Sequence, residues 1–101
     1  MRDRPGIVQS RSDQEAAEAL ALTALAYLLE DDGRTARFLR GTGVDGASLP
    51  VLLEDPVFLG CILDFVLEDE ALLSGVSALA GVRADRIAAM RRRLPGVLIA
   101  E

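Results

Sequence analysis

The stretch DPVFLGCILDFVLE, from Asp55 to Glu68, decides the fold of this chain. Between Val57 and Val66, only Gly60 and Asp64 are neither aliphatic, aromatic nor cysteine. A helix with this sequence is apolar around most of its circumference, so most of its surface has to be buried. We therefore predict that it is the central helix of a small helical domain.

The same residues predict where this helix starts and what its two sides carry. Asp55 can accept hydrogen bonds from the first free backbone N–H groups, and Pro56 suits the first helical position, which needs no donor. On a helical wheel, the broad apolar face carries Phe58, Leu59, Ile62, Phe65 and Val66. The opposite side carries Val57, Gly60, Cys61, Asp64 and Glu68. Because its small residues leave room for another helix, this opposite side is a candidate interaction face, within the fold or with a partner.

A second apolar helix is predicted near the N-terminus. Ser12 and Glu15 fit a capping box, which places the helix at about residues 13–30. Leucines are interleaved with alanines along it, and the alanines form a stripe against which another helix could pack closely. Further helices are expected at about residues 34–40, 47–54, 70–80 and 84–93. If the third of these six helices begins at Ser48, then Pro50 falls in its first turn, where it is tolerated.

Together these elements predict an all-α fold, a small bundle of five or six helices with two central apolar helices. The chain of 101 residues suits one domain, which we expect at residues 12–96. Residues 1–11 lack periodicity and contain Pro-Gly, so we expect a mobile N-terminal arm there. Residues 97–101 form a C-terminal tail, apolar enough either to dock on the body or to stay free.

The composition removes several classes of chemistry. The chain has no histidine, so histidine acid/base catalysis is excluded and a zinc site would need unusual ligands. Cys61 is the only cysteine, so no intramolecular disulfide can form. There is no Gly-rich loop that could cradle a phosphate. We expect a protein without enzyme activity, cofactor or metal.

Hydropathy also bears on location. No apolar run approaches the roughly 18 to 20 residues that cross a bilayer, so we expect no membrane helix. Residues 1–11 lack the apolar stretch of a secretory signal. We therefore expect the protein to be cytoplasmic.

Two acidic clusters mark predicted helix junctions, Glu30-Asp31-Asp32 and Glu68-Asp69-Glu70. If they met in space they could offer oxygen ligands to calcium or magnesium. Neither has the alternating ligand spacing of a calcium-binding loop, and both lie where one helix ends and the next begins. N-capping is therefore the favoured interpretation.

The charge is distributed unevenly. Against a net charge of −5, residues 12–82 carry 13 acids and 3 arginines, whereas residues 83–101 carry 5 arginines and 2 acids. Residues 70–93 resemble a helix-turn-helix unit, with Gly81 at the turn and Val82 as an apolar plug. Its candidate nucleic-acid contacts are Arg83, Arg86, Arg91, Arg92 and Arg93. The acidic middle of the chain repels nucleic acid, so such binding is the alternative and not the favoured function.

Two residues of the central helix could be reactive. A buried Asp64 would need a partner such as Arg34 or Arg37, or a raised pKa, although its wheel position favours exposure. Cys61 has no histidine or lysine to lower its pKa, and the nearby Asp64 carboxylate would raise it. We interpret Cys61 as a small hydrophobic residue.

An ordered set of short motifs resembles a known family. It comprises Ala19-Leu20-Ala21-Leu22, Ala24-Leu25, Phe38-Leu39, Thr42-Gly43-Val44, Phe58-Leu59, Leu63-Asp64-Phe65-Val66-Leu67, Asp69-Glu70 and Gly81-Val82. Over about residues 15–96 the chain is similar to the alphaproteobacterial domain of unknown function 3572. The resemblance implies a small cytoplasmic bacterial domain without an assigned activity, and it carries over no catalytic residue. Arg83, where an Asp is expected, and Pro50 depart from the family pattern.

These observations predict a non-enzymatic protein-interaction or regulatory module in the cytoplasm. Its partner would be another protein or a second copy of the chain. The alternative is nucleic-acid binding through the unit at residues 70–93.

Overall fold

The computed structural model describes residues 5–96, with side chains from Ser12 onward. Within that range the chain is helical and contains no strand, which confirms the predicted all-α fold. The elements are α1 (Pro5–Leu29), α2 (Asp32–Thr42), a 3-10 turn η1 (Gly46–Ser48), α3 (Leu49–Leu52), α4 (Pro56–Leu67), α5 (Glu70–Ala80) and α6 (Ala84–Arg91).

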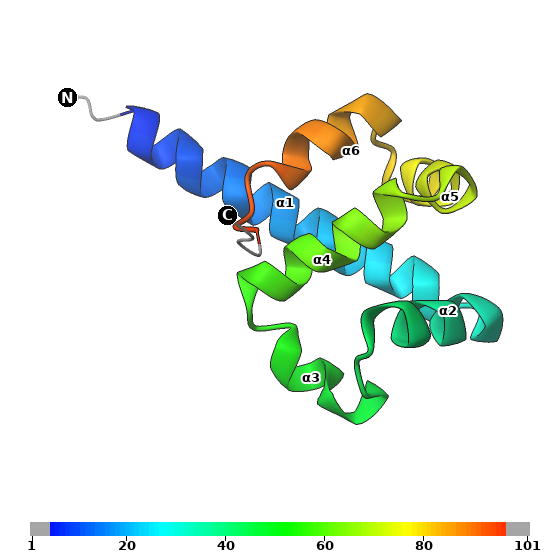
Figure 1. Ribbon diagram of the computed structural model, residues 1–101. Helices are drawn as coiled ribbons and strands as arrows, with labels where there is room; N and C mark the ends of the chain where they lie inside the picture. The colour runs from blue at the N-terminus through cyan, green and yellow to red at the C-terminus, as the bar shows by residue number, and fades with distance from the viewer. Residues whose placement is uncertain (1–4, 97–101) are drawn as a thin grey trace.

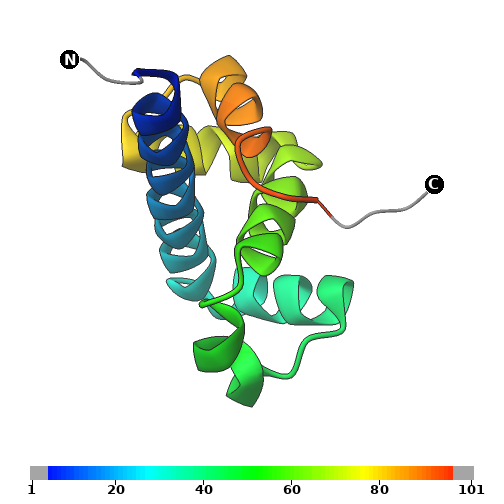
Figure 2. The ribbon, with the colours of Figure 1, turned by 90° about the vertical axis from the view of Figure 1, so that its left-hand side faces the viewer.

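The two long apolar helices, α1 and α4, form the centre of the bundle, as predicted. They share the most extensive contact in the fold, and α1 lies behind α4 in the view of Figure 1. Helices α5 and α6 each contact both of them, whereas α2 packs on α1. In Figure 2, α1 runs down the left-hand side, with α2, α4 and α6 to its right and part of α5 behind its upper part. One side of α1 therefore faces away from the body of the protein.

The core is continuous across the bundle. Its buried side chains are Ala17, Leu20, Ala21, Ala24, Leu25, Leu28, Phe38, Phe58, Leu59, Ile62, Leu63, Val66, Leu72, Val76, Ile87 and Leu94. Four of the five residues on the predicted apolar face of α4 are among them. Phe65 is only half-buried, and its ring packs edge-on against Phe38 with 5.2 Å between centroids. Leu63 and Gly60 are buried as well, and α6 contacts α4 with Arg91 lying over Gly60.

The carboxylate caps follow the prediction closely. Asp55 accepts a hydrogen bond from the N–H of Val57 at 3.0 Å, and α4 begins at Pro56 as expected. Asp69 accepts bonds from the N–H groups of Ala71 and Leu72 at 2.9 and 3.1 Å. Because these short side chains satisfy free helix donors, the start of each helix could be located from the sequence.

The predicted start of α1 is wrong. The helix begins at Pro5, so Ser12 lies inside it and cannot serve as an N-cap. Pro5 suits the first helical position, and no further proline interrupts the chain before Ser12. The predicted mobile arm thus overlaps helical residues from Pro5 onward. Residues 1–4 and the whole predicted tail, 97–101, lie outside the described residues.

Other boundaries differ by a few residues. Helix α2 continues through Gly41 to Thr42 and is capped by Gly43, which has a left-handed φ of 74°. Pro50 sits in the first turn of α3, as expected for a start at Ser48, although the Ser48 hydroxyl makes no capping bond. Helix α6 ends at Arg91, two residues before the predicted end. None of the described helices combines the length and apolar character needed to cross a membrane.

Candidate interaction surfaces

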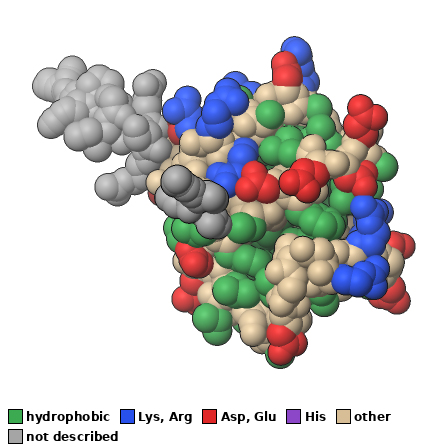
Figure 3. Space-filling model, in the orientation of Figure 1, with side chains coloured by type: hydrophobic (Ala, Val, Ile, Leu, Met, Phe, Trp, Pro, Cys, Tyr) green, Lys and Arg blue, Asp and Glu red, His purple; other side chains and the backbone are tan. Residues whose placement is uncertain are grey.

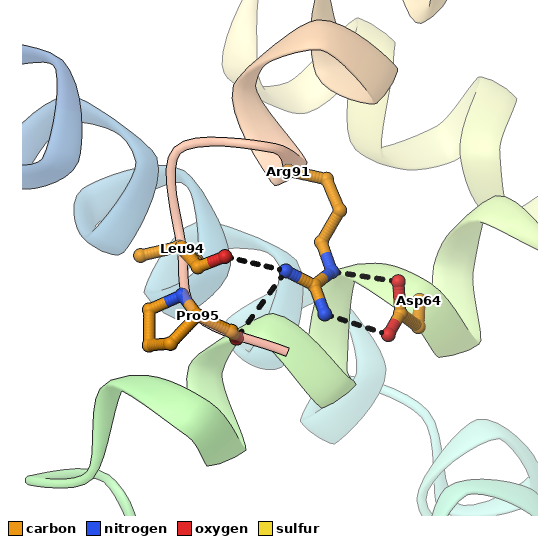
Figure 4. A network of polar contacts seen from close by, with 4 residues as sticks. All are labelled: Asp64, Arg91, Leu94 and Pro95. Atoms are coloured by element: carbon orange, nitrogen blue, oxygen red, sulfur yellow. Dashed lines mark hydrogen bonds and ion pairs between the residues drawn. The ribbon is translucent and has the colours of Figure 1, made fainter. Parts of the chain in front are cut away.

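The predicted interaction face of α4 is covered by a side chain from α6. The Nε and Nη2 atoms of Arg91 donate to the two carboxylate oxygens of Asp64 at 2.7 and 3.0 Å (Figure 4). The guanidinium lies over Gly60, where a Cβ atom would be only 2.9 Å from Cζ of Arg91. Gly60 thus provides the space in which the end of α6 docks.

The third guanidinium nitrogen of Arg91 is also used. Its Nη1 donates to the carbonyl oxygens of Leu94 and Pro95 at 3.0 and 3.4 Å (Figure 4). The side chain is 15% exposed, and its hydrogen bonds to Asp64 raise the pKa of Arg91. Arg91 therefore fixes the segment after α6 on α4 and is not free to contact a phosphate.

The five predicted face residues have different environments. Gly60 is buried, Val57 and Cys61 are half-buried, and Asp64 and Glu68 are exposed. Burial raises the pKa of the Cys61 thiol and the Asp64 carboxylate raises it further, as the sequence indicated, so the thiol is protonated at neutral pH. The middle of this face is thus an internal contact of the fold.

Asp64 pairs with Arg91. The partners considered from the sequence, Arg34 and Arg37, make their contacts elsewhere. Arg34 lies over the ring of Tyr27 at 3.8 Å, and its Nε donates to the Tyr27 carbonyl at 3.1 Å. Arg37 pairs with Asp69 at 2.6 Å. The expected exposure of Asp64 is correct, since half of its side chain remains accessible.

Helices α5 and α6 follow one another across a three-residue turn at residues 81–83, and we call this connectivity alone a helix-turn-helix. Gly81 ends α5 with a left-handed φ of 70°, and the Ser77 hydroxyl donates to the Val82 carbonyl at 2.5 Å across the turn. Of the predicted nucleic-acid contacts besides Arg91, Arg83 pairs with Asp85 at 3.0 Å and Arg93 with Asp13 at 3.6 Å. Arg86 and Arg92 are exposed.

The charged groups do not merge into one basic surface. On the face shown in Figure 3, basic side chains form separate clusters, with acidic side chains between them. A continuous basic stripe is the usual footprint of a nucleic-acid binder. On this face the exposed arginines of α6 are therefore not part of a continuous basic surface.

The acidic junctions serve as helix caps. Asp31 accepts from the N–H of Arg34 at 2.9 Å, and Asp69 caps α5 as described above. Among the residues that the structure describes, no three acidic or cysteine side chains converge as ligands for a metal ion.

The outward face of α1 is uncharged over a long distance. Ala16, Ala19, Leu22, Ala26 and Leu29 are all exposed, and we call this set the α1 stripe. Leu22 and Leu29 each expose 45% of their surface. Between Ala16 and Leu29 the one charged residue is Glu18, which borders the stripe one turn before Leu22 and accepts a hydrogen bond from Gln14, and the exposed Glu15 marks the N-terminal end of the stripe. The alanine spacing indicated part of this stripe, but its exposed leucines were not predicted.

A groove runs beside the α1 stripe. It measures about 340 Å³ and is bordered by Ala16, Ala19 and Thr23 of α1, by Leu79 of α5 and by Met90 of α6. Leu79 is 50% exposed at its edge.

At one end the groove meets a second hollow of about 110 Å³. Ala16 and Met90 line both spaces, and the hollow also contains Asp13, Arg86 and Arg93. The surface beside α1 is therefore apolar along its length and charged at this end.

One family model matches most of the chain. Residues 14–97 match the model of a family described as protein of unknown function, DUF3572. The chain belongs to this family. The DUF3572 region includes the α1 stripe, the Asp64–Arg91 contact and the helix-turn-helix. No curated protein and no solved structure matches the chain, so the DUF3572 assignment brings no activity or ligand with it.

Proposed function

We propose that this DUF3572 protein is a non-enzymatic interaction module of the bacterial cytoplasm that binds a protein through the α1 stripe. The observation that carries the proposal is the exposed, uncharged side of α1 from Ala16 to Leu29. This distance corresponds to about four helical turns. A helix on the surface of a soluble domain usually turns charged and polar residues to solvent. An apolar side of this length is typical of a surface that a partner covers.

The polar groups of the domain support a role without catalysis. The described carboxylates that form close contacts cap helices or pair with arginines, apart from Glu18, which accepts a hydrogen bond from Gln14. The pKa of the Cys61 thiol is raised, and the nearby Asp64 carboxylate is already paired with Arg91. A catalytic site needs a nucleophile or base whose pKa suits the reaction and whose neighbours orient it. Turnover of a metabolite by the purified protein would contradict this part of the proposal.

The interaction role can be tested by affinity capture from the native cells. Leu22→Glu places a charge in the middle of the α1 stripe, whereas Val51→Glu places the same charge on α3, where Val51 is 75% exposed. We expect the wild type and Val51→Glu to retain the same protein and Leu22→Glu to lose it. Equal recovery by all three proteins would overturn the proposed role of the stripe.

Nucleic-acid binding is the second candidate, because Arg86 and Arg92 are exposed beside the helix-turn-helix. Titration of a labelled duplex at low and moderate salt separates the two candidates, since phosphate contacts weaken steeply as salt rises. We expect no binding at either salt concentration. Salt-sensitive binding that Arg86→Glu abolishes would favour the second candidate.

A further inference from the structure

We propose that the protein bound by the α1 stripe is a second copy of this chain, packed antiparallel to the first about a two-fold axis. This inference rests on the proposed interaction function and identifies its partner. Three features of the described residues support it: the order of small and large side chains on the stripe, the position of charges at its two ends, and the groove beside it.

The stripe is complementary to itself when one copy is reversed. Ala19, Leu22, Ala26 and Leu29 follow one another at intervals of three, four and three residues, which is the spacing of a helix–helix seam. A two-fold axis level with Ala24 places Leu22 of one copy opposite Ala26 of the other, and Leu29 opposite Ala19. Each exposed leucine then fills the space left by an alanine, as efficient packing requires.

The charges select the antiparallel arrangement. The same axis brings the acidic junction at Glu30 of one copy level with Ala16 to Glu18 of the other. Ala16 borders the hollow that contains Arg86 and Arg93, where Arg93 pairs with Asp13 and Arg86 makes no ion pair among the described residues. On a helical wheel Glu30 lies on the same flank of α1 as Ala16, and Glu18 lies on the opposite flank. The two-fold axis produces this contact between opposite charges twice.

The groups that would meet are accessible in the single chain. Glu30 exposes 62% of its side chain and Arg93 exposes 59%. Arg86 is exposed and makes no ion pair with any residue of the described part. In a parallel pair Leu22 would face Leu22 of the other copy, and Glu30 would lie about 20 Å along the helix from the partner's hollow, out of reach of Arg86 and Arg93. The antiparallel arrangement is therefore the one that the charges favour.

The size of the contact predicts a weak dimer. From Ala16 to Leu29 the stripe is about 20 Å long, given a rise of about 1.5 Å per residue. A contact of this length, widened by Leu79 and the groove, falls at the small end of specific interfaces. We expect a dissociation constant on the order of micromolar, so that monomer and dimer exchange with concentration.

The test measures the mass of the full chain by sedimentation over a range of concentrations. For the wild type we expect the mass to rise from monomer to dimer as concentration increases, and Val51→Glu should behave in the same way. Glu30→Arg and Arg86→Glu should each raise the dissociation constant roughly tenfold, because like charges then meet twice. Thermal melts of each variant show whether it remains folded.

Mixing the two charge variants tests the arrangement itself. In an antiparallel pair, a Glu30→Arg copy and an Arg86→Glu copy restore both contacts between opposite charges. An equimolar mixture should therefore associate as tightly as the wild type, although neither variant does so alone. If the dimer had the same dissociation constant in all these variants, the proposal would be overturned, because the dimer would then form through another face.

A monomeric wild type at every concentration would also overturn the dimer. The capture experiment then tests whether the α1 stripe binds a different protein. If Leu22→Glu still loses a different protein that the wild type retains, the stripe binds that protein and the interaction function stands. If no protein depends on the stripe, both proposals fail.

Discussion

Arg91 and Asp64 lie 27 positions apart in the sequence and form a bidentate ion pair that joins the end of α6 to α4. Both side chains lie within the DUF3572 region. The sequence placed them in different candidate sites, Asp64 on an interaction face and Arg91 among the nucleic-acid contacts. Because the two side chains pair, the centre of the candidate interaction face on α4 is covered. Arg91 is also no longer available as a nucleic-acid contact.

The geometry of this pair predicts that lysine cannot replace Arg91. A lysine keeps the charge but loses the planar fork that binds both oxygens of Asp64 and reaches two carbonyl groups. Since Asp64 is half exposed, we expect Arg91→Lys to lower the free energy of unfolding by only about 1 kcal/mol. Urea unfolding measures the loss. Arg92→Lys at an exposed neighbour should change stability by less than about 0.5 kcal/mol, and an equal loss in both variants would contradict the prediction.

Gly60 should not tolerate alanine, because the guanidinium of Arg91 lies directly over it. In most helices a glycine-to-alanine change stabilises by roughly 1 kcal/mol. At Gly60 the added Cβ would lie 2.9 Å from Cζ of Arg91, so the guanidinium would have to leave its place. We expect Gly60→Ala to destabilise by about 1 to 2 kcal/mol.

A double-mutant cycle checks the cause of that loss. In an Arg91→Ala background no side chain covers Gly60, and the alanine should become neutral or stabilising. Urea unfolding of the four proteins gives the coupling free energy. Additive effects of the two changes would show that Arg91 is not the obstacle.

Local signals determined much of this fold from the sequence. A carboxylate followed by proline marks the start of α4, and Asp69 and Gly81 bracket α5, because each acts within one turn of its own position. The start of α1 was missed since Ser12 and Glu15 match a capping box equally well whether or not the helix continues before them. A capping pattern shows that a helix can start at a residue, but not that it does.

The surfaces were harder to predict because they depend on which helix covers which. The wheel correctly grouped Gly60 with Asp64, but only the fold shows that α6 lies over them. The sequence predicted α1 as one of two central apolar helices, although α1 has neighbours on one side only and leaves Leu22 and Leu29 exposed. Apolar content gives no indication of how many sides of a helix are covered.

A second glycine contact predicts a larger effect on stability. A Cβ atom on Gly75 of α5 would clash with the hydroxyl group of Tyr27, whose ring is covered by the guanidinium of Arg34. We expect Gly75→Ala to destabilise by about 2 to 3 kcal/mol, because α1 and α5 must separate or the ring must leave its position. Thermal unfolding should show a fall of roughly 10 °C or more.

Ser74→Ala is the matched control on the same helix. Ser74 is exposed, so this change should move the melting temperature very little. A Gly75→Ala protein as stable as this control would mean that the packing of Tyr27 on Gly75 does not restrict the position.

The contact between Asp69 and Arg37 predicts how stability depends on pH. The hydrogen bond from Arg37 lowers the pKa of Asp69, and the capping bond from the N–H of Leu72 lowers it further. A carboxylate with a lower pKa in the folded state stabilises the fold above its unfolded pKa of about 3.9. That stabilisation is lost as the pH falls from there through the folded pKa. Asp69→Asn removes the titration, so its stability should fall less than that of the wild type between neutral and acid pH. The free energy of unfolding from urea titrations across this range measures the difference, and parallel pH profiles for the two proteins would show that Asp69 carries no such linkage.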